Sequence, residues 1–86
     1  MLYKVYVIYS PSHNKLYTGL TTQLGEQLKL FNGDQSVKGI SEFKPWTLVH
    51  MELFNDEGEA SLRESYLKSP HGQAYVRSDI LSLFDF

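Results

Sequence analysis

The first strongly apolar run of the chain, from Lys4 to Tyr9, carries hydrophobic side chains at both odd and even positions. Successive side chains of a β-strand point to opposite faces, so this pattern predicts a strand that is covered on both faces and central in its sheet. Turn-forming residues at 10–14 predict a reversal of the chain. A second strand is predicted from Lys15 to Leu20 and a third from Thr47 to Phe54.

Between the second and third strands the apolar period changes to that of a helix. Leu24, Leu28 and Phe31 recur at helical spacing after two threonines that offer an N-cap. An Asn-Gly pair then ends the predicted helix. The segment 33–44 is polar, contains glycine and has no clear period, which predicts a loop.

Two more helices are predicted in the last third of the chain. The first begins with a capping-box-like pair, Asp56 and Glu59, and runs to about residue 69. A Ser-Pro pair then starts another helix, because proline is favoured at a first helical position. Its apolar stripe is formed by Val76, Ile80, Leu83 and Phe84. The order β-β-α-β-α-α predicts an α+β fold, in which a small three-stranded antiparallel sheet is flanked by about three helices.

The length of the chain, 86 residues, predicts a single domain over residues 1–86. No cysteine is present, so neither a disulfide nor a thiolate metal site reinforces the fold, and six Tyr, five Phe and one Trp supply much of the packing. No segment has the layout of a signal peptide, and the apolar run at 5–9 is far too short to span a bilayer. We therefore expect a cytoplasmic protein with no membrane partner.

The net charge of −2 is unevenly distributed. Residues 1–50 contain five lysines against three acidic residues, a net +2, and residues 51–86 contain three basic against seven acidic residues, a net −4. Dedicated nucleic-acid binders usually present a basic face, because neutralised phosphates supply most of their non-specific affinity. The charge therefore argues against tight DNA binding and leaves room for weak binding.

One carboxylate lies where an apolar side chain is expected. Ala60, Glu64 and Leu67 share one face of the predicted helix, so Glu64 belongs to a partly buried stripe. A carboxylate there needs a cation, a metal or several donors. Lys68 lies four residues on, in the favourable order for an ion pair, and a solvated Glu64–Lys68 pair is the simpler interpretation. Metal ligation by Glu64 is the alternative.

These residues together resemble a GIY-YIG nuclease domain, of the small stand-alone bacterial type related to the nuclease part of an excision-repair enzyme. The resemblance spans roughly residues 3–80 and rests on six short segments in order. In the chain these are Lys4-Val5-Tyr6, Tyr17-Thr18-Gly19, Leu20-Thr21-Thr22-Gln23-Leu24, Asn32-Gly33, Lys44-Pro45-Trp46-Thr47-Leu48-Val49 and the helix that contains Ala60 and Glu64.

The resemblance implies a role for each matched residue. Glu64 would be the sole protein ligand of a Mg²⁺ or Mn²⁺ ion, and Tyr6 and Tyr17 would line the cleft, one of them helping to activate the attacking water. A hard cation suits a carboxylate and polarises water and phosphate. A tyrosine with an ordinary pKa of about 10 needs nearby positive charge to act as a base.

The chain departs from the family pattern on the first helix. Gln27 occupies the position of an arginine that supports the scissile phosphate, and Phe31 that of an assisting His or Tyr. Lys29 and Arg63 are badly placed to substitute, since helix geometry points them away from Gln27 and Glu64. For Phe31 the simpler interpretation is core packing, and His13, His50 and His71 lack ligand spacing.

Two functions remain open from sequence. The favoured one is a degenerate member of the family that keeps the scaffold, to bind nucleic acid or protein. The alternative is a weak Mg- or Mn-dependent DNA endonuclease that uses Tyr6, Tyr17 and Glu64. A scaffold that binds a protein through the apolar segment 81–86 has little support, because that segment is more simply the packed end of the last helix.

Overall fold

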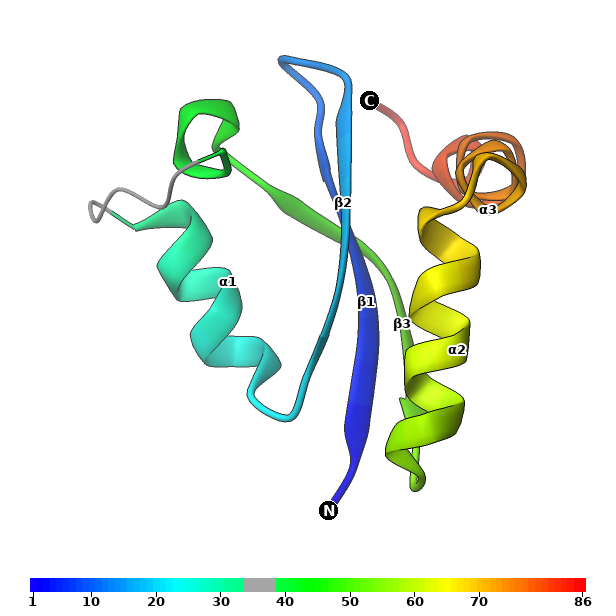
Figure 1. Cartoon of the computed structure of the whole chain (residues 1–86). Helices are drawn as coiled ribbons and strands as arrows, with labels where there is room; N and C mark the ends of the chain where they lie inside the picture. Colours follow the sequence, from blue (N-terminus) through cyan, green and yellow to red (C-terminus); the bar gives the residue numbers. More distant parts are fainter. Residues whose placement is uncertain (34–38) are drawn as a thin grey trace.

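Three antiparallel strands form the sheet in a computed structural model that describes residues 1–33 and 39–86. Strands β1 (Tyr3–Ser10), β2 (Lys15–Thr21) and β3 (Thr47–Phe54) lie in the order β2-β1-β3 (Figure 1). The first strand is therefore central, as its two apolar faces predict. A register shift between Val7 and Ile8 marks a bulge in the pairing of β1 with β3.

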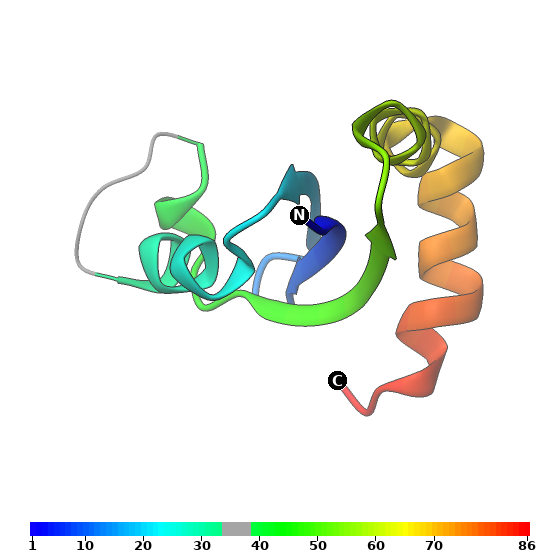
Figure 2. The ribbon, with the colours of Figure 1, turned by 90° about the horizontal axis from the view of Figure 1, so that it is seen from below.

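Helices cover both faces of this sheet. Helix α1 (Leu24–Asn32) lies on one side, and helices α2 (Glu57–Lys68) and α3 (Pro70–Tyr75) lie on the other (Figures 1 and 2). The chain continues from α3 through a π-helical turn (Val76–Ile80) and a 3-10 turn (Leu81–Leu83). The predicted α+β fold and the order β-β-α-β-α-α are confirmed.

The helix starts agree with the predicted caps in two cases out of three. Asp56 caps α2 by accepting a hydrogen bond from Gly58 N at 3.2 Å, and Ser69 caps α3 by accepting one from Gly72 N at 3.1 Å. The N-cap of α1 is Gln23, which makes no side-chain capping bond, so the predicted threonine cap is wrong. Thr21 Oγ1 instead accepts from Gln23 N at 3.0 Å and stabilises the turn that precedes the helix.

The predicted loop at 33–44 is only partly described, because residues 34–38 lie outside the described residues. Its later part contains a turn at Gly39, whose φ of 80° suits glycine, and a 3-10 turn (Ser41–Phe43). Asn32 ties the end of α1 to the start of β3, since its side chain accepts from Trp46 N at 2.6 Å and donates to Trp46 O at 3.0 Å.

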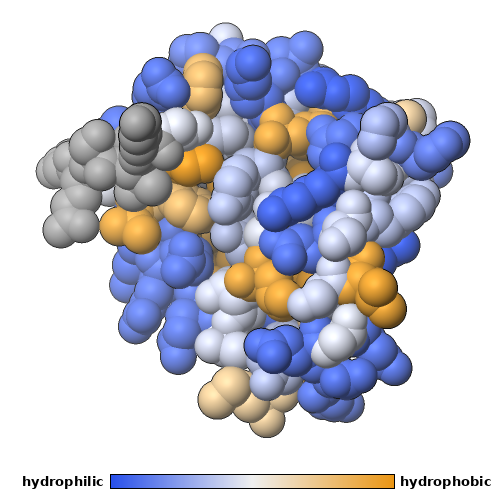
Figure 3. Space-filling model, viewed as in Figure 1, coloured by the Kyte–Doolittle hydropathy of each residue, from blue (hydrophilic) through white to orange (hydrophobic). Residues whose placement is uncertain are grey.

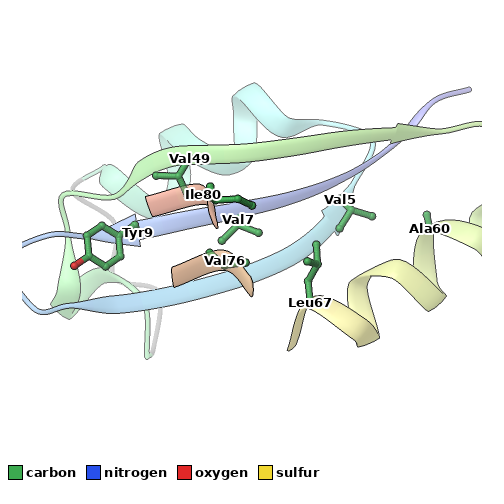
Figure 4. Packing of buried hydrophobic residues seen from close by; sticks show 8 residues of the cluster. All are labelled: Val5, Val7, Tyr9, Val49, Ala60, Leu67, Val76 and Ile80. Atoms are coloured by element: carbon green, nitrogen blue, oxygen red, sulfur yellow. The ribbon is translucent and has the colours of Figure 1, made fainter. Parts of the chain in front are cut away.

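Each face of the sheet has its own hydrophobic cluster. The cluster under α2 and the π-helical turn joins β1 and β3 to these helical segments and consists of Val5, Val7, Tyr9, Val49, Ala60, Leu67, Val76 and Ile80 (Figure 4). The cluster under α1 consists of Tyr6, Ile8, Leu24, Phe31, Ile40 and Trp46. The alternation of β1 side chains between these clusters explains why the whole strand is apolar.

The predicted C-terminal stripe is only half correct. Val76 and Ile80 are buried, but Leu83 is 80% and Phe84 39% exposed. The reason is that the helix passes into a 3-10 turn after residue 80 and Phe84 has extended backbone, so the helical period is lost. Phe86 contacts Tyr9, with ring centroids 4.9 Å apart.

Across the described ranges of the chain, no helix is both long and apolar enough to cross a membrane.

Candidate active site

The two candidate tyrosines lie on the same face of the sheet. Tyr6 pairs with Gly19 across β1 and β2, and Ile8 pairs with Tyr17, so the tyrosines are diagonal neighbours. Their ring centroids are 6.3 Å apart, with the planes tilted by 41°. Both rings face α1, where Tyr6 belongs to the buried cluster and Tyr17 packs at its margin.

Gly19 provides the space in which the Tyr6 ring lies. A Cβ atom on Gly19 would come within 2.5 Å of Tyr6 Cζ and 2.8 Å of Tyr6 Cε1, and it would also meet the hydroxyl. The ring therefore rests directly on the glycine backbone. The glycine of the Tyr-Thr-Gly segment is thus a packing requirement of Tyr6, a role that the sequence pattern alone did not reveal.

The environment of Tyr6 favours its neutral form. Burial raises the pKa of the Tyr6 hydroxyl above its ordinary value, and the neighbouring Tyr17 and Glu64 groups raise it further. Tyr6 is only 2% exposed. At neutral pH the hydroxyl is therefore a hydrogen-bond donor and not a ready proton acceptor.

Glu64 lies beside the buried stripe of α2. Ala60 and Leu67 are fully buried against the sheet, while the Glu64 side chain keeps 22% of its exposure. The carboxylate lies close enough to Tyr6 for its charge to affect the Tyr6 pKa. Its Oε2 accepts from Lys68 Nζ at 3.1 Å, so the ion pair predicted from the spacing is present.

Helix α1 forms the third side of the site with an apolar residue. Phe31 is 5% exposed and packs edge-on against Tyr17, with ring centroids 5.6 Å apart. Its predicted role as a core residue is confirmed. Gln27 lies one turn earlier on the same helix and is half-buried. The structure therefore brings Tyr6, Tyr17 and Phe31 into contact.

A charged network on the opposite face of the sheet was not predicted from the sequence. Arg63 donates from Nε and Nη2 to the two oxygens of Glu52 at 2.8 and 2.9 Å, and His50 Nε2 lies 2.6 Å from Glu52 Oε2. Burial alone would raise the pKa of Glu52, but the hydrogen bonds from Arg63 and His50 outweigh it and lower that pKa. No local pattern pairs these residues, because they meet only when α2 packs on β3.

Because Arg63 is bound in this network, it is not available to pair with Glu64. The guanidinium of Arg63 is committed to Glu52 and also lies over the rings of Tyr66 and Tyr75, at 5.2 and 6.0 Å from their centroids. Arg63 and Glu64 are adjacent on α2 and so lie on different sides of the buried stripe. Lys68 is therefore the cation that meets Glu64.

The remaining histidines are far from a ligand arrangement. His13 Nδ1 lies 2.9 Å from Ser12 Oγ in the exposed hairpin turn, and His71 is exposed at the start of α3. Within the residues that the structure describes, no three His, Asp or Glu side chains are grouped so that they could hold a metal ion. The family resemblance would make the Glu64 carboxylate the protein ligand of a divalent ion, with water and phosphate oxygens as the other ligands.

The surface in the view of Figure 3 is mostly hydrophilic, with hydrophobic residues in separate patches. Among the exposed apolar side chains is Leu62 on α2, at 75% exposure. Isolated apolar residues of this kind are ordinary on a protein surface.

Comparison with known proteins identifies the family of the chain. The model of the GIY-YIG catalytic domain family matches residues 2–76. The UPF0213 protein SH2523 of Staphylococcus haemolyticus is 34% identical over 56 residues, which cover 65% of this chain and 68% of that protein.

A solved structure has the same fold. The solution structure of the UPF0213 protein BH0048 from Bacillus halodurans superimposes with a TM-score of 0.55 at 24% identity, over 91% of this chain and 84% of that one. The likeness concerns the fold: a three-stranded antiparallel sheet with helices in the same order.

Proposed function

The chain belongs to the GIY-YIG catalytic domain family, and from this premise we propose that it is a nuclease-like domain that has lost catalysis and serves as a binding module. The tyrosines and the glutamate that the resemblance assigns to the site are retained. The cationic and proton-transferring side chains expected on the first helix are replaced by Gln27 and Phe31.

The packing of Phe31 is the observation that carries this proposal. A buried phenyl ring set edge-on against Tyr17 fills the place of the assisting His or Tyr with hydrocarbon. A phenyl ring neither donates nor accepts a proton, and it excludes water from the side of the tyrosine that it covers. Loss of one preorganised phosphate-side donor typically lowers a rate by about 10²–10³.

Two further observations support it. The pKa of Tyr6 is raised, which is the wrong direction for a general base. The charge of Glu64 is already balanced by Lys68, and the other cation on that stretch of α2, Arg63, is engaged with Glu52.

A weak Mg- or Mn-dependent DNA endonuclease is the second candidate. The contact of Tyr6 with Tyr17, within reach of the Glu64 charge, favours it. Glu64 would hold the ion, which would polarise water and a phosphodiester. In that case the neutral Tyr6 hydroxyl would donate a hydrogen bond to a phosphate or water oxygen, and Tyr17 would pack beside its ring.

The expected partner of the binding module is nucleic acid, held weakly. The net charge is −2, and the excess of lysine lies in residues 1–50. Few phosphates can be neutralised, so affinity should be low and should fall with added salt. If no nucleic acid binds, the partner that we propose in its place is a protein.

Nicking of supercoiled plasmid DNA in Mg²⁺ or Mn²⁺ tests the proposal, with Glu64→Gln as the matched control. The expected result is that wild type and variant both stay at the rate without protein. Cleavage by the wild type that disappears in the variant would establish the endonuclease instead. Fluorescence anisotropy with a labelled branched oligonucleotide, at 50 and 200 mM salt, measures the binding in the same preparations.

A further inference from the structure

Lys68 forms an ion pair with Glu64, the carboxylate of the candidate site. Its ammonium lies 3.1 Å from Glu64 Oε2, on the next turn of the same helix. Lys68 is also the basic residue in the last turn of α2, where the helix macrodipole favours a positive charge. Two attractions therefore hold the ammonium in this place.

Lys68 can be displaced, since its side chain is 52% exposed while that of Glu64 is 22% exposed. An ion pair with one partner in water is weak and is screened by salt. The carboxylate, by contrast, has limited contact with water and gains more from a cation than an exposed one would. The pair thus combines a partly enclosed anion with a more exposed cation.

We propose that Lys68 is a built-in counter-ion that competes with divalent metal for Glu64. This inference goes beyond the proposed function, because it concerns metal affinity and holds whether or not DNA is cleaved. A divalent ion that binds Glu64 must displace the Lys68 ammonium and is then repelled by that nearby positive charge. On the described part of the chain, no group of three or more His, Asp or Glu side chains is placed to offset that cost.

Removal of the lysine charge therefore strengthens metal binding. Lys68→Met keeps the aliphatic stem and removes the ammonium. We expect the Kd for Mn²⁺ to fall by about tenfold, because the ion no longer has to break the exposed Glu64–Lys68 pair and no longer meets the screened repulsion of the ammonium. Lys68→Arg keeps the charge and should bind Mn²⁺ as the wild type does. Lys29→Met, an exposed lysine on α1, changes the net charge equally and should shift the Kd by less than twofold.

The experiment titrates Mn²⁺ into each purified chain and measures free ion by electron paramagnetic resonance. Thermal melting confirms that each variant is folded. Adding Glu64→Gln to Lys68→Met should remove the gain, which locates the ion at Glu64. Equal Kd values for Lys68→Met and Lys29→Met would overturn the proposal, and so would an unchanged gain in the double variant.

The plasmid assay separates this proposal from the proposed function. Tighter Mn²⁺ binding by Lys68→Met without nicking supports both. Nicking by the wild type contradicts the loss of catalysis and leaves the metal competition to be judged by the titration alone.

Discussion

Gly19→Ala tests the packing on which the tyrosine pair depends. The new methyl group would lie within 2.5 Å of Tyr6 Cζ, far inside van der Waals contact. A flexible surface side chain could move aside at little cost. Tyr6 cannot, because it is 2% exposed and packs among Ile8, Leu24 and Phe31.

The expected destabilisation can be estimated from two opposing effects. Overpacking of a well-packed core costs about 1–3 kcal/mol. Replacing glycine by alanine gives back about 0.4–1 kcal/mol by restricting the unfolded chain. The net loss is about 1–2 kcal/mol, which for a domain of this size lowers the Tm by about 5–15 °C.

Gly25→Ala is the matched control, since the same substitution meets no atom within 4 Å in the exposed part of α1. It should stabilise the chain by about 0.5–1 kcal/mol through helix propensity. Calorimetry of both variants measures the two shifts, which are predicted to be opposite in sign. In a double-mutant cycle, the cost of Gly19→Ala should disappear in a Tyr6→Ala background. A Gly19→Ala variant as stable as the wild type would refute the placement of the ring.

Three other variants have defined outcomes. Glu52→Gln should cost about 1–2 kcal/mol at pH 7 by breaking the bidentate bond with Arg63. The pKa of Glu52 is lowered in the folded state, so the stability that its carboxylate contributes is present above the unfolded pKa of about 4.3 and is lost as the pH falls through the folded pKa. Urea unfolding at pH values from 7 to 3 should therefore show that the free energy of unfolding declines less steeply with falling pH in the variant than in the wild type. Gly72→Ala should cost about 3 kcal/mol in the same assay, because its Cβ would lie 2.6 Å from backbone of α2 that cannot yield cheaply. The double variant Gln27→Arg, Phe31→His should nick plasmid DNA in the presence of metal at a rate about 10²–10³ times that of the wild-type chain. An unchanged rate would mean that catalysis lacks more than these two side chains.

Elements that depend on local pattern were predictable from sequence. The central position of β1 followed from its two apolar faces, and the caps at Asp56 and Ser69 followed from residue type. The Glu64–Lys68 pair followed from the helical spacing of four residues.

Features created by tertiary packing were not predictable in this way. The Glu52–Arg63 bond joins a strand to a helix 11 positions away, so it requires the docking of α2 on β3. The need for glycine at position 19 arises from a ring on the neighbouring strand. Leu83 belongs to the predicted apolar stripe only if the α-helical period continues, whereas the chain is π-helical over Val76–Ile80 and then forms a 3-10 turn.

Single-turnover nicking of supercoiled plasmid by the wild-type chain in Mn²⁺ tests the loss of catalysis most directly. Protein in excess over DNA removes any dependence on weak binding, and Glu64→Gln is measured beside it. The account predicts that both proteins leave the plasmid at the rate seen without protein. A wild-type rate well above that background, abolished in Glu64→Gln, would contradict it.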